Sequence, residues 1–314
     1  MASSIVVVGV ASLYMSVGVP GFPVEHAPGV PPAWLRSGVA GSAAHVAKVL
    51  SALGNDVRLC TLAGSDPAGL AVRADLRAAG LPADGIVDAG ATSLGVVLVS
   101  PDGSRMGYPY LAAVNAVGYP AGTFRHLAAG TSLAVLTNTR FAGPLLGHAR
   151  DLSVPIAVDV HLIADVDDVY NRPWLEVADI VFCSHERLPC PPAEWAARMF
   201  ARYPGCEIVG IGQGAEGAIL GLRDGTLVRA SAVAPRGVVS TTGAGDALFA
   251  SFLHGWLATG SPVQALSSAV LHAGWKIGCP LPGDASLSEN ELARLGTQCQ
   301  VRTEIGRWDD GGSA

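Results

Sequence analysis

A glycine-rich turn followed by an aspartate supplies the residue types that phosphate chemistry needs. The chain reads Ser-Thr-Thr-Gly-Ala-Gly-Asp over residues 240–246 and continues as an apolar run of helix-forming residues. Gly243, Ala244 and Gly245 can form a turn tight enough to aim successive N–H groups at one point, in front of the positive end of a helix dipole. Asp246 would then take a proton from an attacking hydroxyl group while this anion hole holds a phosphoryl oxygen. The pattern predicts phosphoryl transfer.

The same residues have a plainer interpretation, because a threonine at position 241 or 242 is also a common cap of a core helix. The elements around the turn bear on that choice. The apolar run Ile5–Val8 ends at Gly9, as expected for the first strand of a parallel sheet. Three more apolar runs alternate with helix-length segments, namely Leu133–Leu136, Pro155–Asp159 and Ile180–Cys183. Repeated units of this kind predict a doubly wound α/β sheet.

Two motifs together resemble the signature of the ribokinase-like (PfkB) carbohydrate and nucleoside kinases. That signature is usually written DTTGAGD before an apolar helix, and six of its seven positions match residues 240–246. The second match, Gly-Ala-Glu-Gly-Ala over 214–218, follows a strand-like run at Glu207–Ile211. The two motifs are more specific together than either is alone.

The resemblance implies one ribokinase-like domain over residues 1–302, built on a mostly parallel, doubly wound sheet with helices on both faces. It also implies a small β-sheet lid from about residues 10–36 and 92–113. The Pro-Asp-Gly turn at 101–103 makes the second of these segments a hairpin. The implied activity is transfer of the γ-phosphoryl group of ATP, with Mg²⁺, to a hydroxymethyl group of a sugar or nucleoside, with Asp246 as general base.

The family's nucleotide site lies at the carboxyl ends of strands and against one later helix. The nucleotide-binding residues implied in this way are Ser184, Gly212, Gly214, Gly217, Thr242, Val270 and Gly274. The family's Asn-x-x-Glu motif, tied to magnesium and phosphate, is replaced by Ser-His-Glu-Arg over 184–187, which leaves Glu186 as the candidate for a Mg²⁺–phosphate contact. Ser240 replaces the leading Asp of the signature, which argues against activation by K⁺.

The residues that bind sugar hydroxyl groups in the family are also replaced in this chain. An Asp is usual five residues after the glycine that ends the first strand, and this chain has Tyr14 there. A phenol can stack on a ring, so Tyr14 favours a nucleoside or other ring-bearing glycoside over a bare polyol, unless it only packs in the lid. Asn115 sits where the family often has an Ala-Asn pair near the substrate, which makes it a candidate substrate-binding residue, or it is simply a turn former. Asp-Val-His over 159–161 replaces an Asp-x-Asn motif.

From Ser37 a loop of small residues is expected to lead into a helix that Gly54 closes. The family has two glycines, three variable residues and an Asn here. Counting back from Gly54 places His45 on the Asn and Gly41 in the pair. A second register places Ser42 on the Asn. In either register the substrate-binding amide is absent.

Composition narrows the function further. The 314 residues are half apolar and carry a net charge of −6 without a basic run, so neither nucleic acid nor an anionic membrane is indicated as a partner. The apolar start is too short for a signal peptide or membrane span, which predicts a cytoplasmic protein.

Six scattered cysteines predict free thiols, and residues 303–314 are expected to be disordered.

Two functional alternatives therefore remain. The first is a small-molecule kinase, with a homodimer through the lid as an option. The second is a catalytically weakened relative that binds a sugar or nucleoside without turning it over. Retention of Asp246 favours the kinase, because a carboxylate facing an anion hole gives a pure binding protein no advantage.

Overall fold

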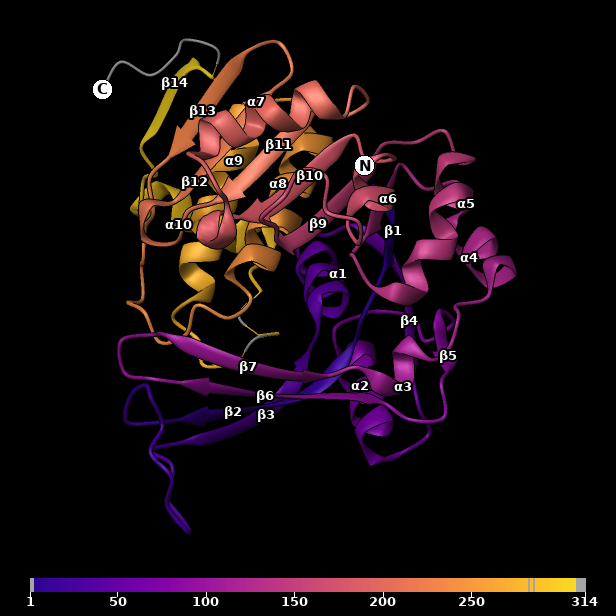
Figure 1. Cartoon of the computed structure of the whole chain (residues 1–314), viewed down its shortest axis with the longest axis vertical. Helices are drawn as coiled ribbons and strands as arrows, with labels where there is room; N and C mark the ends of the chain where they lie inside the picture. Colours follow the sequence, from indigo (N-terminus) through magenta and orange to yellow (C-terminus); the bar gives the residue numbers. More distant parts are fainter. Residues whose placement is uncertain (1–2, 282, 285, 309–314) are drawn as a thin grey trace.

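In the computed structural model, which describes residues 3–281, 283–284 and 286–308, a ten-stranded sheet forms the centre and a four-stranded sheet lies across one end of it (Figure 1). The strands of the large sheet, in spatial order, are β14 (Thr303–Arg307), β13 (Thr226–Ala230), β12 (Ala218–Leu222), β11 (Ile208–Gly212), β10 (Ile180–Ser184), β9 (Ile156–Leu162), β8 (Leu133–Leu136), β1 (Ser4–Val8), β4 (Asp56–Ala63) and β5 (Ile86–Asp88). All neighbours from β11 to β5 are parallel, whereas β12, β13 and β14 extend the sheet antiparallel. The predicted doubly wound, mostly parallel sheet is confirmed.

Strand β1 illustrates why apolar runs form the middle of this sheet. Ile5 and Val7 belong to the core on one face, and Val6 and Val8 belong to the core on the other. Because alternate side chains point to opposite faces, a strand buried on both faces must be apolar at every position. The chain reverses its winding direction at β1, between β4 and β8, and sites in such sheets lie at the carboxyl ends of the strands at that point.

Helices cover both faces of the large sheet. The helices on one face are α1 (Ser42–Ala52), α2 (Pro67–Ala78), α8 (Ala244–Thr259), α9 (Pro262–Lys276) and α10 (Glu289–Gln298). Those on the other are α3 (Ala112–Asn115), α4 (Ala121–Ala128), α5 (Leu146–Arg150), α6 (Arg172–Leu175) and α7 (Pro192–Arg202), with 3₁₀ turns at Arg140–Leu145, His185–Arg187 and Gly214–Glu216. None of the described helices has the length and apolar character needed to cross a membrane.

The lid is the four-stranded sheet, in the order β3 (Leu35–Ala40), β2 (Ser12–Gly18), β6 (Ser93–Val99) and β7 (Arg105–Tyr110). Its register gives it two different faces. Tyr14 is opposite Gly38 and Gly95, and Gly95 is opposite Pro109, so the face with Tyr14 carries mostly small side chains. The ring of Tyr14 occupies the space above Gly95, where an added Cβ would lie 2.2 Å from a ring carbon.

Three sequence-based expectations differ from this fold. The segment from Ser37 was expected to be a loop, but residues up to Ala40 form β3, because backbone pairing with β2 takes precedence over the small side chains. Asn115, for which a turn was the alternative to substrate binding, is the last residue of the short helix α3. Thr303–Arg307, expected to be disordered, pairs with β13 as β14, and residues 309–314 of that tail lie outside the described residues. The cysteines among the described residues are free, as predicted.

Candidate active site

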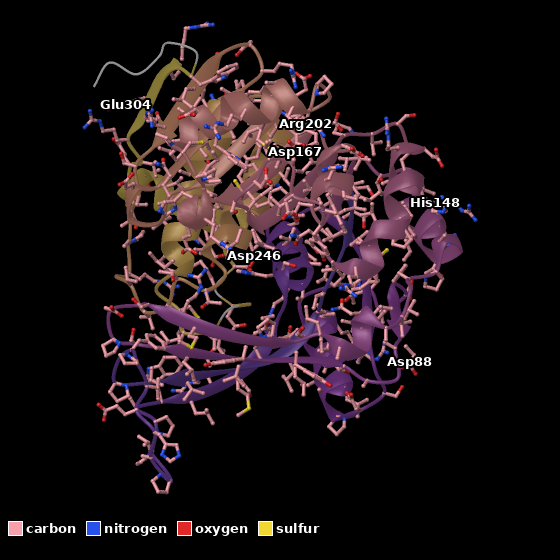
Figure 2. All side chains as sticks on the ribbon, in the orientation of Figure 1. Asp88, His148, Asp167, Arg202, Asp246 and Glu304 are labelled. Carbon is pink, nitrogen blue, oxygen red and sulfur yellow. The ribbon has the colours of Figure 1, made fainter. Side chains whose placement is uncertain are left out.

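A cavity of about 670 Å³ lies between the inner face of the lid and the carboxyl ends of β1, β8 and β9. The sequence-predicted residues that line it are Tyr14, Gly41, Ser42, His45, Asn115, Thr242, Gly243 and Asp246. Figure 2 shows Asp246 at the edge of the helical layer that faces the lid sheet. The large sheet, helix α8 and the lid thus bring together residues that are more than 230 positions apart in the chain.

The turn before α8 has the conformation that its sequence predicts. Gly243 is the N-cap residue and adopts φ 83°, in the left-handed region that glycine enters without strain. The N–H groups of Gly243, Gly245 and Asp246 have no hydrogen-bond acceptor within the described part of the chain, whereas that of Ala244 donates to the Thr241 carbonyl oxygen at 3.2 Å. Unpaired N–H groups at the positive end of a 16-residue helix are able to donate hydrogen bonds to an anion.

Asp246 lies against a buried histidine. Nδ1 of His45 is 3.5 Å from Oδ2 of Asp246, at the long limit of a hydrogen bond, and His45 is 1% exposed. Burial alone would raise the pKa of Asp246, but the contact with His45 and the charges of His45, His161 and Lys276 lower it below its ordinary value. Burial lowers the pKa of His45, with Asp246 acting in the opposite direction. Asp246 is therefore ionised near neutral pH, as a general base requires.

A second histidine approaches Asp246 from the end of β9. The ligand atoms of Asp159, His161 and Asp246 lie within 4.8 Å of one another, and Nδ1 of His161 is 3.4 Å from Oδ2 of Asp159. Burial raises the pKa of Asp159. The pKa of His161 is raised on balance, because Asp159 and Asp246 outweigh the opposing effect of burial. The sequence identified His161 only as a departure from the family pattern, and not as a neighbour of Asp246.

The lid contacts the anion-hole turn directly. Nη1 of Arg105, at the start of β7, donates to Oγ1 of Thr241 at 2.9 Å, and Arg105 lines the cavity. Oγ1 of Thr241 in turn donates to the Gly103 carbonyl oxygen at 3.4 Å. This contact brings a positive charge beside the turn before α8. No sequence motif marked Arg105, because its position depends on how the lid sheet lies over the turn.

Gly41 shows why the chain before α1 needs a glycine. It is the N-cap residue of α1 with φ 99°, and an added Cβ would lie 2.4 Å from the Val10 carbonyl oxygen. Ser42 and His45 follow on the helix and both line the cavity, so the two sequence registers place a polar side chain in the same site. The helix ends as predicted, with Gly54 at φ 91° just beyond Leu53.

The residues assigned to the nucleotide, apart from Thr242, do not line this cavity. Ser184 and Gly212 end the neighbouring strands β10 and β11, and Gly214 and Gly217 bound the turn that follows, with positive φ at both. The hydroxyl oxygen of Ser184 accepts a hydrogen bond from the N–H of Glu186 at 3.3 Å. These groups share the carboxyl edge of the sheet with the turn before α8, but they do not line the described cavity.

Val270 and Gly274 in α9 are buried. Val270 belongs to the core, and an added Cβ at Gly274 would lie 2.1 Å from the Val233 carbonyl oxygen. The small residue at 274 thus allows the loop after β13 to pack closely on α9. Neither residue faces the cavity that contains Asp246.

No sequence pattern marked one buried cationic residue near the site. Lys276, the last residue of α9, is 1% exposed, and its Nζ has no hydrogen-bond partner within the described residues. Burial lowers its pKa to about 8, although Cys279, Asp284 and Asp246 act in the opposite direction. The next residue, Ile277, accepts hydrogen bonds from the N–H groups of Val239 and Ser240, so the end of α9 supports the start of the anion-hole segment.

The chain was compared with protein families, curated proteins and solved structures. The model of the pfkB family carbohydrate kinases matches residues 2–289. The chain is 32% identical over 237 residues to an acarbose 7(IV)-phosphotransferase of Actinoplanes sp., covering 73% of this chain and 76% of the relative. It is 29% identical over 239 residues to an ATP-dependent ribose-1-phosphate kinase of Halopiger xanaduensis, covering 74% and 78%.

The fold has close structural relatives as well. The solved structure of the microbiome-derived acarbose kinase Mak1 superposes with a TM-score of 0.83 at 24% identity, covering 94% of this chain and 99% of that one. The match to the family model includes the lid, the turn before α8 and every strand of the large sheet except β14. The chain is a member of the pfkB family of carbohydrate kinases, and its activity is that of a sugar or nucleoside phosphotransferase.

Proposed function

We propose that this protein transfers the γ-phosphoryl group of ATP to a hydroxymethyl group of a sugar or nucleoside, with Asp246 as general base. The observation that carries this proposal is the position of Asp246. It lines the acceptor cavity in the first turn of α8, beside N–H groups that have no acceptor among the described residues. A carboxylate and an anion hole at one end of a cavity are the two groups that phosphoryl transfer to an alcohol requires.

In the proposed reaction the acceptor hydroxyl group loses its proton to Oδ1 of Asp246, since Oδ2 faces His45 and Oδ1 has no partner within the described residues. The hydroxyl oxygen forms a bond to the γ-phosphorus, and the bond from that phosphorus to the β,γ-bridging oxygen breaks, which releases ADP. The N–H groups of Gly243 and Gly245 stabilise the equatorial oxygens of the phosphoryl group. Arg105 adds positive charge from the lid side.

The nucleotide is assigned to the carboxyl edge of β10 and β11, beside the anion hole. Backbone N–H groups around Gly214 and Gly217, together with Thr242, would contact its phosphates. Glu186 is exposed, and its carboxylate has no hydrogen bond or ion pair among the described residues, which fits a residue that holds Mg²⁺ through the phosphates. Mg²⁺ bound there would neutralise phosphate charge during transfer. Because ATP is the donor, we place the activity in the cytoplasm.

The acceptor end of the cavity favours a molecule with a ring beyond its reactive hydroxymethyl group. Tyr14 and His45 stand where a carboxylate and an amide would grip sugar hydroxyls, and Tyr14 presents a phenol ring to the cavity. Stacking of that kind contributes about 0.5–1.5 kcal/mol for a good ring pair. The relatives named above are kinases of acarbose and of ribose 1-phosphate, which keeps carbohydrate derivatives among the acceptors.

The outer face of the lid supports a homodimer as part of this proposal. Apolar side chains from all four strands share that face and are more than one-third exposed, namely Met15, Leu35, Leu94, Met106, Tyr108 and Tyr110. An apolar sheet face of this extent is expected to be covered by a second copy of the chain. Sedimentation equilibrium of wild type and Tyr108→Glu tests this, since only the wild type should dimerise.

A panel of acceptors tests the proposed function. ATP-dependent formation of a phosphate ester should be measured with ribose, fructose, maltose, adenosine, inosine and cytidine, for wild type and Tyr14→Ala. We expect the nucleosides and maltose to have a higher kcat/KM than free ribose and fructose, and to lose that advantage in Tyr14→Ala. If acceptors bind but no ADP or ester forms with any of them, the protein is a binding protein and the proposal is wrong. If free ribose or fructose is best, Tyr14 only packs in the lid.

A further inference from the structure

Part of the cavity wall is not used by the proposed reaction. Leu162, the last residue of β9, and Tyr170, in the loop before α6, belong to this part, and they are 45% and 44% exposed. Arg140, two residues after Asn138, also lines the cavity, and its charge opposes the rise in the pKa of the Tyr170 phenol that burial causes. Two large apolar surfaces left open in a cavity wall are typical of a ligand contact.

The ring of Tyr170 is fixed in place without any ligand. Its hydroxyl group donates to the Asn138 carbonyl oxygen at 2.6 Å, and its ring lies 5.4 Å from that of Trp174 with 30° between the planes. Asn138 is itself held, because its side-chain amide donates to the Val160 carbonyl oxygen at 3.2 Å and to Oδ1 of Asn171 at 2.9 Å. A ring that is already ordered loses little conformational freedom when a ligand stacks on it.

Leu162 reaches the cavity through an irregularity in β9. Asp159 pairs with Phe182 of β10, but Leu162 pairs with Ser184, so β9 has one extra residue between the two pairs. Within this bulge His161 adopts φ 57°, in the left-handed region that non-glycine residues rarely enter. Bulges and strained residues near a site redirect side chains. Here the bulge turns His161 toward Asp159 and Asp246 and leaves Leu162 exposed on the cavity wall.

The chemistry of this wall selects a type of ligand. A phenol ring and an aliphatic side chain suit the C–H faces of a saturated ring. The guanidinium of Arg140 can only donate hydrogen bonds, and the hydroxyl oxygens of a sugar can accept them. A flat base would be better held between two aromatic faces, and the second wall residue here is Leu162. The substantial exposure of Leu162, Tyr170 and Arg140 also leaves this part of the wall open to solvent, so a ligand can extend along it.

We propose that Arg140, Leu162 and Tyr170 form a subsite, the Tyr170 subsite, for a second sugar ring linked glycosidically to the ring that is phosphorylated. The proposal rests on the proposed function, because it assumes that the phosphorylated ring occupies the end of the cavity beside Asp246. It makes a disaccharide or longer glycoside the preferred acceptor, ahead of a free monosaccharide or a nucleoside. None of these three residues was marked by a sequence motif.

The test compares glucose, maltose and maltotriose, which differ in the number of sugar rings, and adds inosine as a nucleoside. The ratio kcat/KM with ATP should be measured for glucose, maltose, maltotriose and inosine, in wild type and in Tyr170→Ala. Val169→Ala is the matched control, since Val169 is adjacent in the chain, 80% exposed and outside the cavity lining. We expect maltose and maltotriose to exceed glucose and inosine in the wild type. Tyr170→Ala should lower the maltotriose-to-glucose ratio by about three- to tenfold, as expected for loss of one stacking contact, and Val169→Ala should leave it unchanged.

A binding measurement separates this proposal from the proposed function. Isothermal titration of maltotriose into the protein without ATP requires no turnover, so it reports on the Tyr170 subsite even if no ester forms. Binding to wild type that weakens by about three- to tenfold in Tyr170→Ala supports the subsite. The subsite is overturned if glucose or inosine is the better acceptor, if Tyr170→Ala affects one-ring and three-ring acceptors equally, or if maltotriose does not bind. Absence of turnover alone overturns only the proposed function.

Discussion

Replacement of Lys276 by methionine is expected to stabilise the protein at neutral pH. The ammonium group is 1% exposed and has no hydrogen-bond partner within the described residues, so the folded state disfavours its charged form. Its pKa falls from the ordinary 10.5 to about 8. At 1.36 kcal/mol per tenfold change in proton affinity, this difference corresponds to a cost of about 3 kcal/mol at pH 7.

The sign of this effect follows from proton binding. Because the pKa of Lys276 is lower in the folded than in the unfolded chain, the unfolded chain binds more protons between about pH 8 and 10.5. Lys276 therefore makes the free energy of unfolding rise with pH across that window, and it lowers this free energy most below pH 8. By the same relation the cost shrinks to about 1 kcal/mol near pH 9.5.

Urea unfolding of wild type and Lys276→Met at pH 7 and pH 9.5 measures the effect. The variant should be more stable by about 3 kcal/mol at pH 7 and by roughly 1 kcal/mol at pH 9.5, less any loss of packing. Lys48→Met is the control, because Nζ of Lys48 lies 3.0 Å from Oδ2 of Asp75 and its removal should give no gain. A Lys276→Met variant that is less stable at pH 7, or whose advantage does not change with pH, would refute the reasoning.

Two further predictions concern the site itself. In His45→Asn, Asp246 loses the neighbour that most lowers its pKa while it stays buried, so the acid limb of the kcat–pH profile should move to higher pH. Ser42→Ala is the control, because Ser42 lines the same cavity without that contact, and it should leave the limb in place. A shift in both variants would assign the effect to the cavity in general. In Gly245→Val the added atoms meet nothing within 4 Å at Cβ, so the melting temperature should hold while kcat falls by about 10²–10³, the usual value of one oxyanion-hole donor. A large loss of melting temperature in Gly245→Val would instead indicate that the turn only supports the fold.

The anion-hole turn could be predicted from the sequence because it depends on a few adjacent residues. The left-handed conformation of Gly243 and the helix that follows are local consequences of glycine spacing and an apolar run. The main strands were equally clear, since full burial on both faces requires unbroken apolar runs. In these elements local pattern and tertiary structure agree.

Two neighbours of Asp246 could not be predicted, because they come from distant segments without a motif. His161 reaches Asp246 only through the bulge in β9, and Lys276 through the packing of α9. Strand β14 gave no signal because its side chains are largely exposed, so its pairing with β13 depends on backbone hydrogen bonds instead of burial. Arg105 was missed for a similar reason, since its contact with Thr241 depends on the placement of the whole lid.

The most direct test of the account is the turnover of Asp246→Asn. The substitution keeps the shape of the side chain and removes the base, so kcat with ATP and the best acceptor should fall by about 10²–10⁴, the usual contribution of a positioned general base. ATP affinity, measured by titration without acceptor, should stay close to that of the wild type. An unchanged kcat at saturating acceptor would contradict the assignment of Asp246 as the catalytic base.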